Sequence, residues 1–264
     1  MIEKVINNLP VESAGEFEIS EDGIIKRYTG MKTAIIIPQT IRGIAVQAIG
    51  ERAFASKKLT TVVIPESVTE IGDLAFVNNQ LTEIVIPNSV MEIGTCTFFS
   101  NRLTNIIIPN SVTKIGIAAF SQNQLTEVII PSSVTKISEN AFYNNQLVKV
   151  IILEGVKEIG NYAFLDNQLV AIIIPNSIMK IGKGAFRDNQ LTEITIPQSV
   201  TKVGKEAFTI NRLNSITIYG KVSLPRKSKY PIPAFNNGFD DFYKSKRRKV
   251  GTYLFDGKEW SVKE

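Results

Sequence analysis

The side chains that most often perform chemistry are sparse in this chain of 264 residues. Histidine, the commonest general base and metal ligand, is absent, and the single cysteine, Cys96, excludes an intramolecular disulfide and a multi-cysteine zinc site. Cys96 is expected to be a partly buried, inert thiol. Asp240 and Asp241 form a carboxylate pair of low specificity, and no glycine-rich phosphate loop occurs. The sequence therefore predicts a non-enzymatic protein without a metal or cofactor, although residue types alone still allow a carboxylate-only hydrolase.

A recurring asparagine is the other polar feature that could bind something. It returns every 22 residues, at Asn79, Asn101, Asn123, Asn145, Asn167, Asn189 and Asn211. An amide side chain both donates and accepts, so this column could bind a ligand or satisfy backbone groups of turns that lack a ladder partner. Buried polar groups are nearly always hydrogen-bonded, which favours the structural role.

These asparagines belong to a longer repeat, whose units begin at Leu59, Leu81, Leu103, Leu125, Leu147, Leu169 and Leu191. The template is L-T-x-I-x-I-P-x-S-V-x-x-I-G-x-x-A-F-x-x-N-Q. A fixed period of this length is typical of a solenoid, in which each unit is one coil.

Within a unit, the first third has the composition of a β-strand. In the fourth unit Leu125, Val128 and Ile130 are expected to point inward, and Glu127 and Ile129 outward. One strand per coil, always in the same direction, predicts a parallel sheet with strands about 4.8 Å apart. The segment ENAFYN is expected to form a short helical turn, and phenylalanines at its position in eight coils should stack into an aromatic spine.

The string IPxSVxxIGxxAFxxN, over about residues 16–218, resembles the BspA-like or Treponema-type bacterial leucine-rich repeat. This resemblance implies a right-handed, curved solenoid with the parallel sheet on its concave face and short helical turns on the other side. It also implies adhesion or partner binding, often at a bacterial surface, and no enzyme activity. Leu153, Gly155 and Ser138 depart from the motif, and Thr97 stands where alanine is usual, so local distortion is expected at Thr97.

The organisation predicted along the chain has three parts. Residues 1–31 form an N-terminal segment and a capping hairpin around Asp22-Gly23, and residues 32–218 form the solenoid. The solenoid comprises an irregular first coil (32–58), seven repeats (59–212) and a partial repeat (213–218). Residues 219–264 form a basic cap that ends in a hairpin around Asp256-Gly257, with Trp260 over the last coil.

Two details of the ends remain open from the sequence. Ile2, Val5, Ile6 and Leu9 have helical spacing, so a short helix against the first coil is one expectation. The extra residues around Arg42-Gly43-Ile44 could form a binding loop or part of the cap, and the cap is favoured.

Positive charge is concentrated in the C-terminal part. The net charge is +5, yet residues 219–264 alone have eleven Lys or Arg against five Asp or Glu. The centre of this segment is a candidate anionic patch, made of Lys244, Lys246, Arg247, Arg248 and Lys249. Such a cluster could bind an anionic polymer or lipid, but charge runs are usually solvated, so a cap surface is favoured. No specific nucleic-acid binding is expected.

The outward face of the strands is the most informative surface. One outward column is polar and includes Glu127 and Lys149, whereas the next is aliphatic in six successive coils, at Val63, Val85, Ile107, Ile129, Ile151 and Ile173. This aliphatic column either favours strand formation alone, binds a protein or peptide partner of host or bacterial origin, or mediates self-association. Partner binding is favoured, with the basic patch as the alternative site of attachment.

The sequence does not decide the compartment. Residues 1–15 lack the apolar run of a signal peptide, and no stretch approaches the ~20 apolar residues of a membrane span. The family resemblance predicts an extracellular or cell-surface protein if a signal has been removed, and a cytoplasmic protein otherwise.

Overall fold

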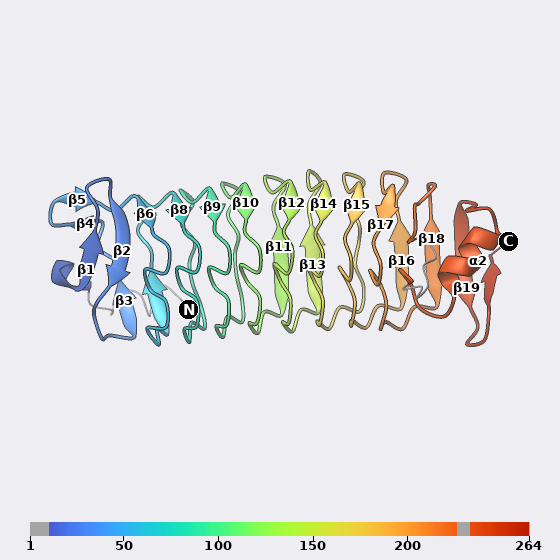
Figure 1. Cartoon of the computed structure of the whole chain (residues 1–264), viewed down its shortest axis with the longest axis horizontal. Coiled ribbons are helices and arrows are strands. Elements are labelled where there is room, and N and C mark those ends of the chain that lie inside the picture. The colour runs from blue at the N-terminus through green and yellow to red at the C-terminus, as the bar shows by residue number, and fades with distance from the viewer. Residues whose placement is uncertain (1–10, 226–232, 264) are drawn as a thin grey trace. The chain divides into compact units, whose positions relative to one another are not determined.

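The computed structural model of the chain describes residues 11–225 and 233–263. Two compact units, Met1–Thr126 and Glu127–Glu264, are treated in turn. The helix expected from Ile2 to Leu9 lies outside the described residues. In both units the chain winds through short strands and turns with little helix, which confirms the predicted leucine-rich-repeat solenoid (Figure 1).

From residue 11 onward, unit 1 has a 3₁₀ helix followed by strands in three sheets. Its elements are η1 (Ala14–Glu16), β1 (Phe17–Ile19), β2 (Ile24–Tyr28), β3 (Ala34–Ile36), β4 (Thr40–Ile41), β5 (Ile44–Ala45), β6 (Ala48–Ile49), β7 (Thr61–Val63), β8 (Glu70–Ile71), β9 (Glu92–Ile93) and β10 (Lys114–Ile115). The sheet orders are β1-β2-β6-β8-β9-β10, β3-β7 and β4-β5.

The described part of unit 2 likewise has three sheets, and one α-helix near its C-terminal end. Its elements are β11 (Glu127–Ile130), β12 (Lys136–Ile137), β13 (Lys149–Ile152), β14 (Glu158–Ile159), β15 (Lys180–Ile181), β16 (Glu193–Ile196), β17 (Lys202–Val203), β18 (Ser215–Ile218), α2 (Phe239–Ser245), β19 (Gly251–Phe255) and β20 (Trp260–Val262). The sheet orders are β11-β13, β12-β14-β15-β17 and β16-β18-β19-β20.

The expected parallel strands are present, but their ladder is interrupted. Within the described residues they pair as β3 with β7, β11 with β13, and β16 with β18, and otherwise only through a single bridge between Val63 and Val85. The longest parallel ladders instead join two-residue strands after the turn, β6-β8-β9-β10 in unit 1 and β12-β14-β15-β17 in unit 2. This second ladder was not expected from the sequence.

The predicted helical turn opposite the strands is wrong. In the described part of the chain this segment contains no helix, because two residues per coil adopt a left-handed conformation, such as Tyr162 (φ 55°) and Asp166 (φ 58°) in unit 2. Left-handed residues reorient the peptide planes, so several N–H groups of this segment bond carbonyls of the next coil instead of their own coil. Phe164 N–H, for example, donates to the Ala185 carbonyl at 2.8 Å.

The phenylalanine column is buried as predicted. In unit 1, Phe54, Phe76 and Phe98 are fully buried, with ring centroids 5.0 and 5.5 Å apart and nearly parallel planes. In unit 2, Phe142, Phe164, Phe186 and Phe208 continue the same arrangement at 5.4–5.5 Å. The aromatic spine is therefore confirmed within each unit, and identical neighbours in register keep each ring offset onto the next.

The asparagine column performs the structural role. The Asn167 amide donates to the Phe142 and Phe164 carbonyls at 3.0 and 3.2 Å, and its Oδ1 accepts the Leu147 N–H at 3.0 Å. Asn79 in unit 1 has the equivalent bonds to the Phe54 and Phe76 carbonyls and the Leu59 N–H. Each amide thus satisfies turn groups of its own coil and of the coil before it.

The departures from the template are accommodated locally. Thr97 is fully buried and its hydroxyl donates to the Gly72 and Gly94 carbonyls, while Phe76 N–H still bonds the Thr97 carbonyl, so the expected distortion at Thr97 is wrong. Leu153 uses the N–H that a proline would lack to bond the Ile130 carbonyl at 3.1 Å. Gly155 adopts a φ of 122°, a conformation that disfavours the usual serine.

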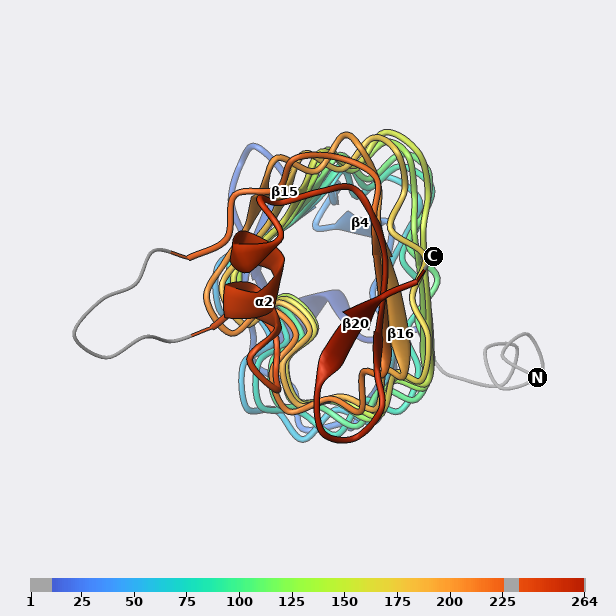
Figure 2. The ribbon, with the colours of Figure 1, turned by 90° about the vertical axis from the view of Figure 1, so that its right-hand side faces the viewer.

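Hairpins lie at both ends, as predicted. In unit 1, β1 and β2 pair antiparallel around Asp22-Gly23, and the extra residues of the first coil form a second hairpin, β4-β5, whose Ile41 is buried. In unit 2, β19 and β20 pair antiparallel, β19 joins β18, and Phe235 stacks on Phe208 at 5.0 Å. Figure 2, viewed toward this end, shows α2 and β20 in front of the coils of unit 2.

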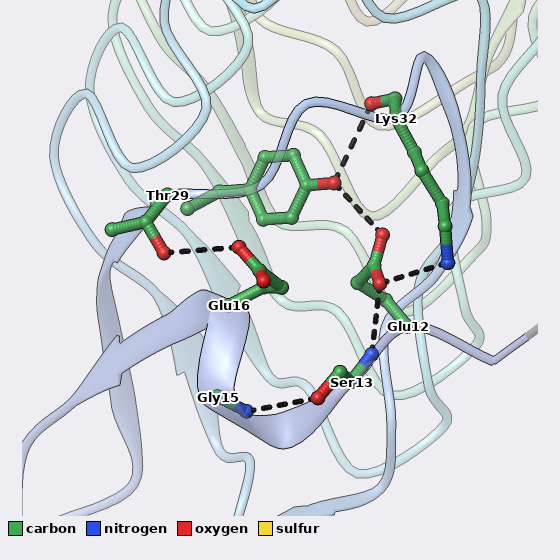
Figure 3. A network of polar contacts seen from close by, with 7 residues as sticks. Glu12, Ser13, Gly15, Glu16, Thr29 and Lys32 are labelled. Atoms are coloured by element: carbon green, nitrogen blue, oxygen red, sulfur yellow. Dashed lines mark hydrogen bonds and ion pairs between the residues drawn. The ribbon is translucent and has the colours of Figure 1, made fainter.

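A buried carboxylate joins the start of the described chain to the first coil (Figure 3). Glu12 accepts the Tyr28 hydroxyl at 2.9 Å, the Ser13 N–H at 2.9 Å and the Lys32 ammonium at 3.1 Å. Burial raises the pKa of Glu12, but these three donors outweigh burial and hold the pKa below its ordinary value. The charged form is therefore the one that this cap stabilises.

Glu12→Gln is expected to loosen this attachment, because a neutral amide replaces charge-assisted bonds that stabilise by about 1–3 kcal/mol. Amide hydrogen exchange should become faster at the Glu12 N–H, which bonds the Ile36 carbonyl. Since the folded pKa is depressed, the wild-type contribution is present above the unfolded pKa of about 4.3 and disappears as pH falls through the folded pKa. Unchanged exchange in the variant at pH 7 would contradict this role.

Candidate binding surface

In unit 2 the aliphatic column lies on the outward face of paired strands. Ile129 of β11 lies opposite Ile151 of β13, and both are exposed (54% and 37%) while the residues on either side are buried. Ile173 in the next coil is 85% exposed. Three successive coils of unit 2 therefore present an isoleucine to solvent, as the strand pattern predicts.

The polar column runs beside it. Glu127 lies opposite Lys149 in the same strand pair, and both side chains are exposed. The isoleucines are thus flanked by one acidic and one basic group. A partner that covers the apolar side chains would also contact charges of both signs. This favours one binding orientation over nonspecific hydrophobic association.

In unit 1 the same column is less uniform. Val63 at the end of β7 is half-buried, Val85 is 43% exposed and Ile107 is 76% exposed. Val85 forms only a single bridge to Val63, and residues 105–108 form no strand in the structure. The predicted column is therefore present on unit 1 as exposed side chains, but on a less regular support.

Two exposed valines extend the apolar surface of unit 2 beyond the prediction. Val148 and Val170 are 49% and 55% exposed and stand one residue before Lys149 and Ala171. The repeat has threonine at this position in other coils, as at Thr126 and Thr192. The replacement of this threonine by valine is the feature of the sequence from which the two exposed valines could have been predicted.

A cavity of about 430 Å³ opens in unit 1 between two coils. It is lined by residues of the segments 83–88 and 104–109, among them Val85 and Ile107. This cavity had no counterpart in the sequence prediction, because it depends on the spacing of two strands and not on their residue types.

The residues of the candidate anionic patch lie on α2 and the turn after it. Lys244 donates to the Pro225 carbonyl at 3.0 Å, and Lys246 lies over the Phe242 ring at 5.2 Å. Arg247 and Arg248 adopt left-handed conformations, and they and Lys249 are exposed. Two of the five cations thus have partners in the cap, and the others face solvent.

Cys96 and Asp240, two of the groups considered for catalysis, lie in surroundings that fit a structural role. Burial raises the pKa of the Cys96 thiol, which keeps it protonated and unreactive. Asp240 is buried and accepts the N–H groups of Ala234 and Phe235 at 2.8 and 3.0 Å, so it holds the turn before α2. Among residues 11–225 and 233–263, no three His, Cys, Asp or Glu side chains gather as a metal site. Within those ranges, no helix has the length and apolarity needed to span a membrane.

The sequence profile of the BspA type leucine rich repeat region matches this chain in six copies, over residues 32–149 and 135–229. A leucine-rich repeat protein from Bacteroides ovatus is similar in structure, with 27% identity and a TM-score of 0.61. That match covers 78% of this chain but 63% of the other, so this chain spans less than two thirds of that relative.

Two further solved structures are similar. A leucine rich repeat protein from T. pallidum has 25% identity and a TM-score of 0.48, covering 60% of this chain and 89% of that one. A leucine rich cell surface protein from Faecalibacterium prausnitzii has 23% identity and a TM-score of 0.47, covering 97% of this chain and 62% of that one. A search of curated proteins gives no match.

Proposed function

The chain belongs to the family of BspA-type leucine-rich repeat proteins, and we propose that it is a non-enzymatic module that binds a protein partner through the exposed aliphatic column of unit 2. Leucine-rich repeats typically serve as interaction scaffolds, and they are typically not enzymes. The observation that carries the proposal is the row of Ile129, Ile151 and Ile173, which are solvent-exposed in successive coils.

Physical reasoning supports a binding role for this row. Strand formation alone needs a β-former at each position, but not an apolar one, since Thr195 and Thr217 occupy the same column in the paired strands β16 and β18. Val148 and Val170 add to the apolar area, and Glu127 and Lys149 supply a polar rim. An apolar centre with a polar rim is the usual anatomy of a protein interface.

The same family membership supports our proposal for the partner and for the place of action. A protein of host or bacterial origin, met at a bacterial cell surface, is the partner that we propose, and adhesion is the corresponding role. A second copy of this chain is the other partner that the row allows. Two such rows are complementary to each other, so the chain would then self-associate.

Attachment to an anionic polymer or lipid through the basic patch is the alternative function. The observation in its favour is the run of four exposed cations, Lys246, Arg247, Arg248 and Lys249. Binding of this kind should weaken steeply with salt, whereas apolar binding should not.

The test replaces Ile129 and Ile151 with lysine. Exposed sites away from special features shift stability by about 0.5 kcal/mol or less, so circular dichroism should show a folded chain. Partner capture in a pull-down from surface extracts, or self-association in sedimentation velocity, should be abolished, because a desolvated interface centre tolerates unpaired charge poorly.

Matched variants separate the two functions. Glu127→Ala with Lys149→Ala changes the polar column, and glutamine at Lys246, Arg247, Arg248 and Lys249 removes the patch charge. Binding that survives the lysine changes but disappears in the glutamine variant and at high salt would replace the first function with the second.

A further inference from the structure

The second parallel ladder of unit 2 presents lysines to solvent. Its strands β12, β14, β15 and β17 pair in register, which places in one row Lys136, Glu158, Lys180 and Lys202. Figure 2, in which β15 marks this ladder, shows it on a different side of the coils from β16 of the strand sheet. The lysine row therefore belongs to a surface other than that of the isoleucines.

The row continues into the C-terminal cap. Lys202 forms a backbone bridge with Ser223, so the partial coil after β18 extends the ladder, and Lys221 stands exposed two residues before Ser223. The turn after α2 is tied to the same coil, because the Tyr243 hydroxyl donates to the carbonyls of Gly220 and Arg248 at 3.4 and 3.3 Å. We refer to the combined surface as the basic face, made of Lys136, Lys157, Lys180, Lys202, Lys221 and residues 246–249.

The carboxylates of this face do not balance its positive charge. Nine Lys or Arg stand against two Glu in the segments that build it, 131–137, 153–159, 175–181, 197–203, 219–225 and 246–250. Glu158 Oε2 lies 3.6 Å from Lys136 Nζ and 3.7 Å from Lys180 Nζ, and the Glu154 carboxylate accepts two backbone N–H groups. Both acids are thus engaged, and most of the cations have no acidic neighbour.

This excess is particular to unit 2. The equivalent segments of unit 1, 65–71, 87–93 and 109–115, have one lysine against three glutamates. The repeat itself therefore does not demand cations at these positions, since the same coil is built with acids there.

Exposed apolar side chains stand among the cations. Tyr219 and Val250 are 62% and 59% exposed, and they occupy the next positions in the antiparallel register after the pair Ile218 and Gly251, which places them next to each other. Met179, one residue before Lys180, is 53% exposed. The coil does not require an apolar side chain at the Met179 position, because Thr135 and Thr201 occupy it in other coils of unit 2.

Cations mixed with exposed apolar side chains fit the surface of an anionic membrane. Lysine and arginine are attracted by the negative charge of the lipid head groups, while apolar side chains enter the boundary between head groups and acyl chains. Tyrosine in particular is enriched at this boundary. A soluble anionic polymer would contact the cations and leave the apolar side chains in water.

We propose that the basic face binds an anionic lipid surface peripherally, with Tyr219 and Val250 entering the head-group layer and the cations facing the lipid phosphates. The inference rests on the alternative function given above, in which it selects lipid over polymer and extends the site from the cap to the second ladder. It does not involve the isoleucine row, which stays free for a protein partner.

Co-sedimentation of the full chain with vesicles tests the choice of lipid. Wild type should bind vesicles of phosphatidylcholine mixed with phosphatidylglycerol, and not vesicles of phosphatidylcholine alone. Tyr219→Ser with Val250→Ser keeps every charge and should weaken binding to the anionic vesicles about tenfold or more, because two apolar side chains no longer enter the interface. Binding of the same variant to soluble polyphosphate should equal that of wild type.

The other outcomes of this experiment contradict the proposal. Unchanged vesicle binding by the serine variant would overturn the insertion of Tyr219 and Val250. Binding of polyphosphate without binding of vesicles would replace the lipid with a polymer, and binding of neither would overturn the basic face as a site.

A second pair of variants tests the share of the ladder. Lys202→Gln with Lys221→Gln should weaken vesicle binding about tenfold or more, since each cation near an anionic leaflet contributes to binding. Lys26→Gln with Arg27→Gln removes the same charge from exposed positions of unit 1 and should leave binding nearly unchanged. Equal losses in both variants would show general attraction of a cationic chain and not a defined face. Ile129→Lys with Ile151→Lys, the test of the proposed function, should not weaken vesicle binding, so the two failures are distinguishable.

Discussion

Phe164→Ala should lower the free energy of unfolding by about 3–5 kcal/mol, as is typical of a large buried aromatic side chain. Phe164 is fully buried and stacks on Phe142 at 5.5 Å and on Phe186 at 5.4 Å. Its removal leaves a cavity between two rings that are fixed by the backbone bonds of their own coils, so the gap cannot close by a small shift.

Urea unfolding of the full chain measures this effect, and Tyr219→Ala is its control. Tyr219 is an aromatic residue of the same unit that is 62% exposed, so its loss should change stability by about 0.5 kcal/mol or less. A near-neutral Phe164→Ala would show that the spine contributes little, and the coils would then depend mainly on their backbone ladders.

Deletion of residues 219–264 should cause the second large effect, namely aggregation or fraying of the last coils. The deleted part includes β19, which pairs with β18, and Phe235, which covers Phe208. Without them a strand edge and a buried ring become exposed, as in any solenoid that lacks its terminal cap. Size-exclusion chromatography and thermal unfolding of the deletion variant measure this.

Charge removal is the matched control for the deletion. Glutamine at Lys246, Arg247, Arg248 and Lys249 leaves the aromatic contacts of Phe235, Phe239 and Trp260 intact, so this variant should remain monomeric and cooperative. If the deletion variant behaves in the same way, the C-terminal segment is not a cap.

The sequence predicts the solenoid well because its period assigns each residue type to a column. Phe164 and Asn167 recur in register with identical neighbours, so burial at one such position predicts burial of its equivalents in the neighbouring coils. The same logic places Ile129 outward, since its neighbours Val128 and Ile130 belong to the inward set.

What the sequence does not predict depends on backbone details that residue types leave open. Tyr162 is not a residue that usually signals a left-handed conformation, so the turn ladder could not be distinguished from a short helix. The cavity beside Ile107 has the same origin, since the two segments that line it have the composition of ordinary paired strands.

The asparagine hydrogen bonds also imply an order in which the coils are completed during synthesis. Asn167 closes the turn of the coil before it, through the Phe142 carbonyl and the Leu147 N–H. At the end of the stack, Asn236 likewise bonds the coil before it, through the Ile210 N–H and the Asn211 carbonyl. During synthesis from the N-terminus, the asparagine of each closure leaves the ribosome about one coil later than the groups that it satisfies. A coil of this protein is therefore complete only after its successor has emerged, and the most recent coil of a nascent chain is always an open one.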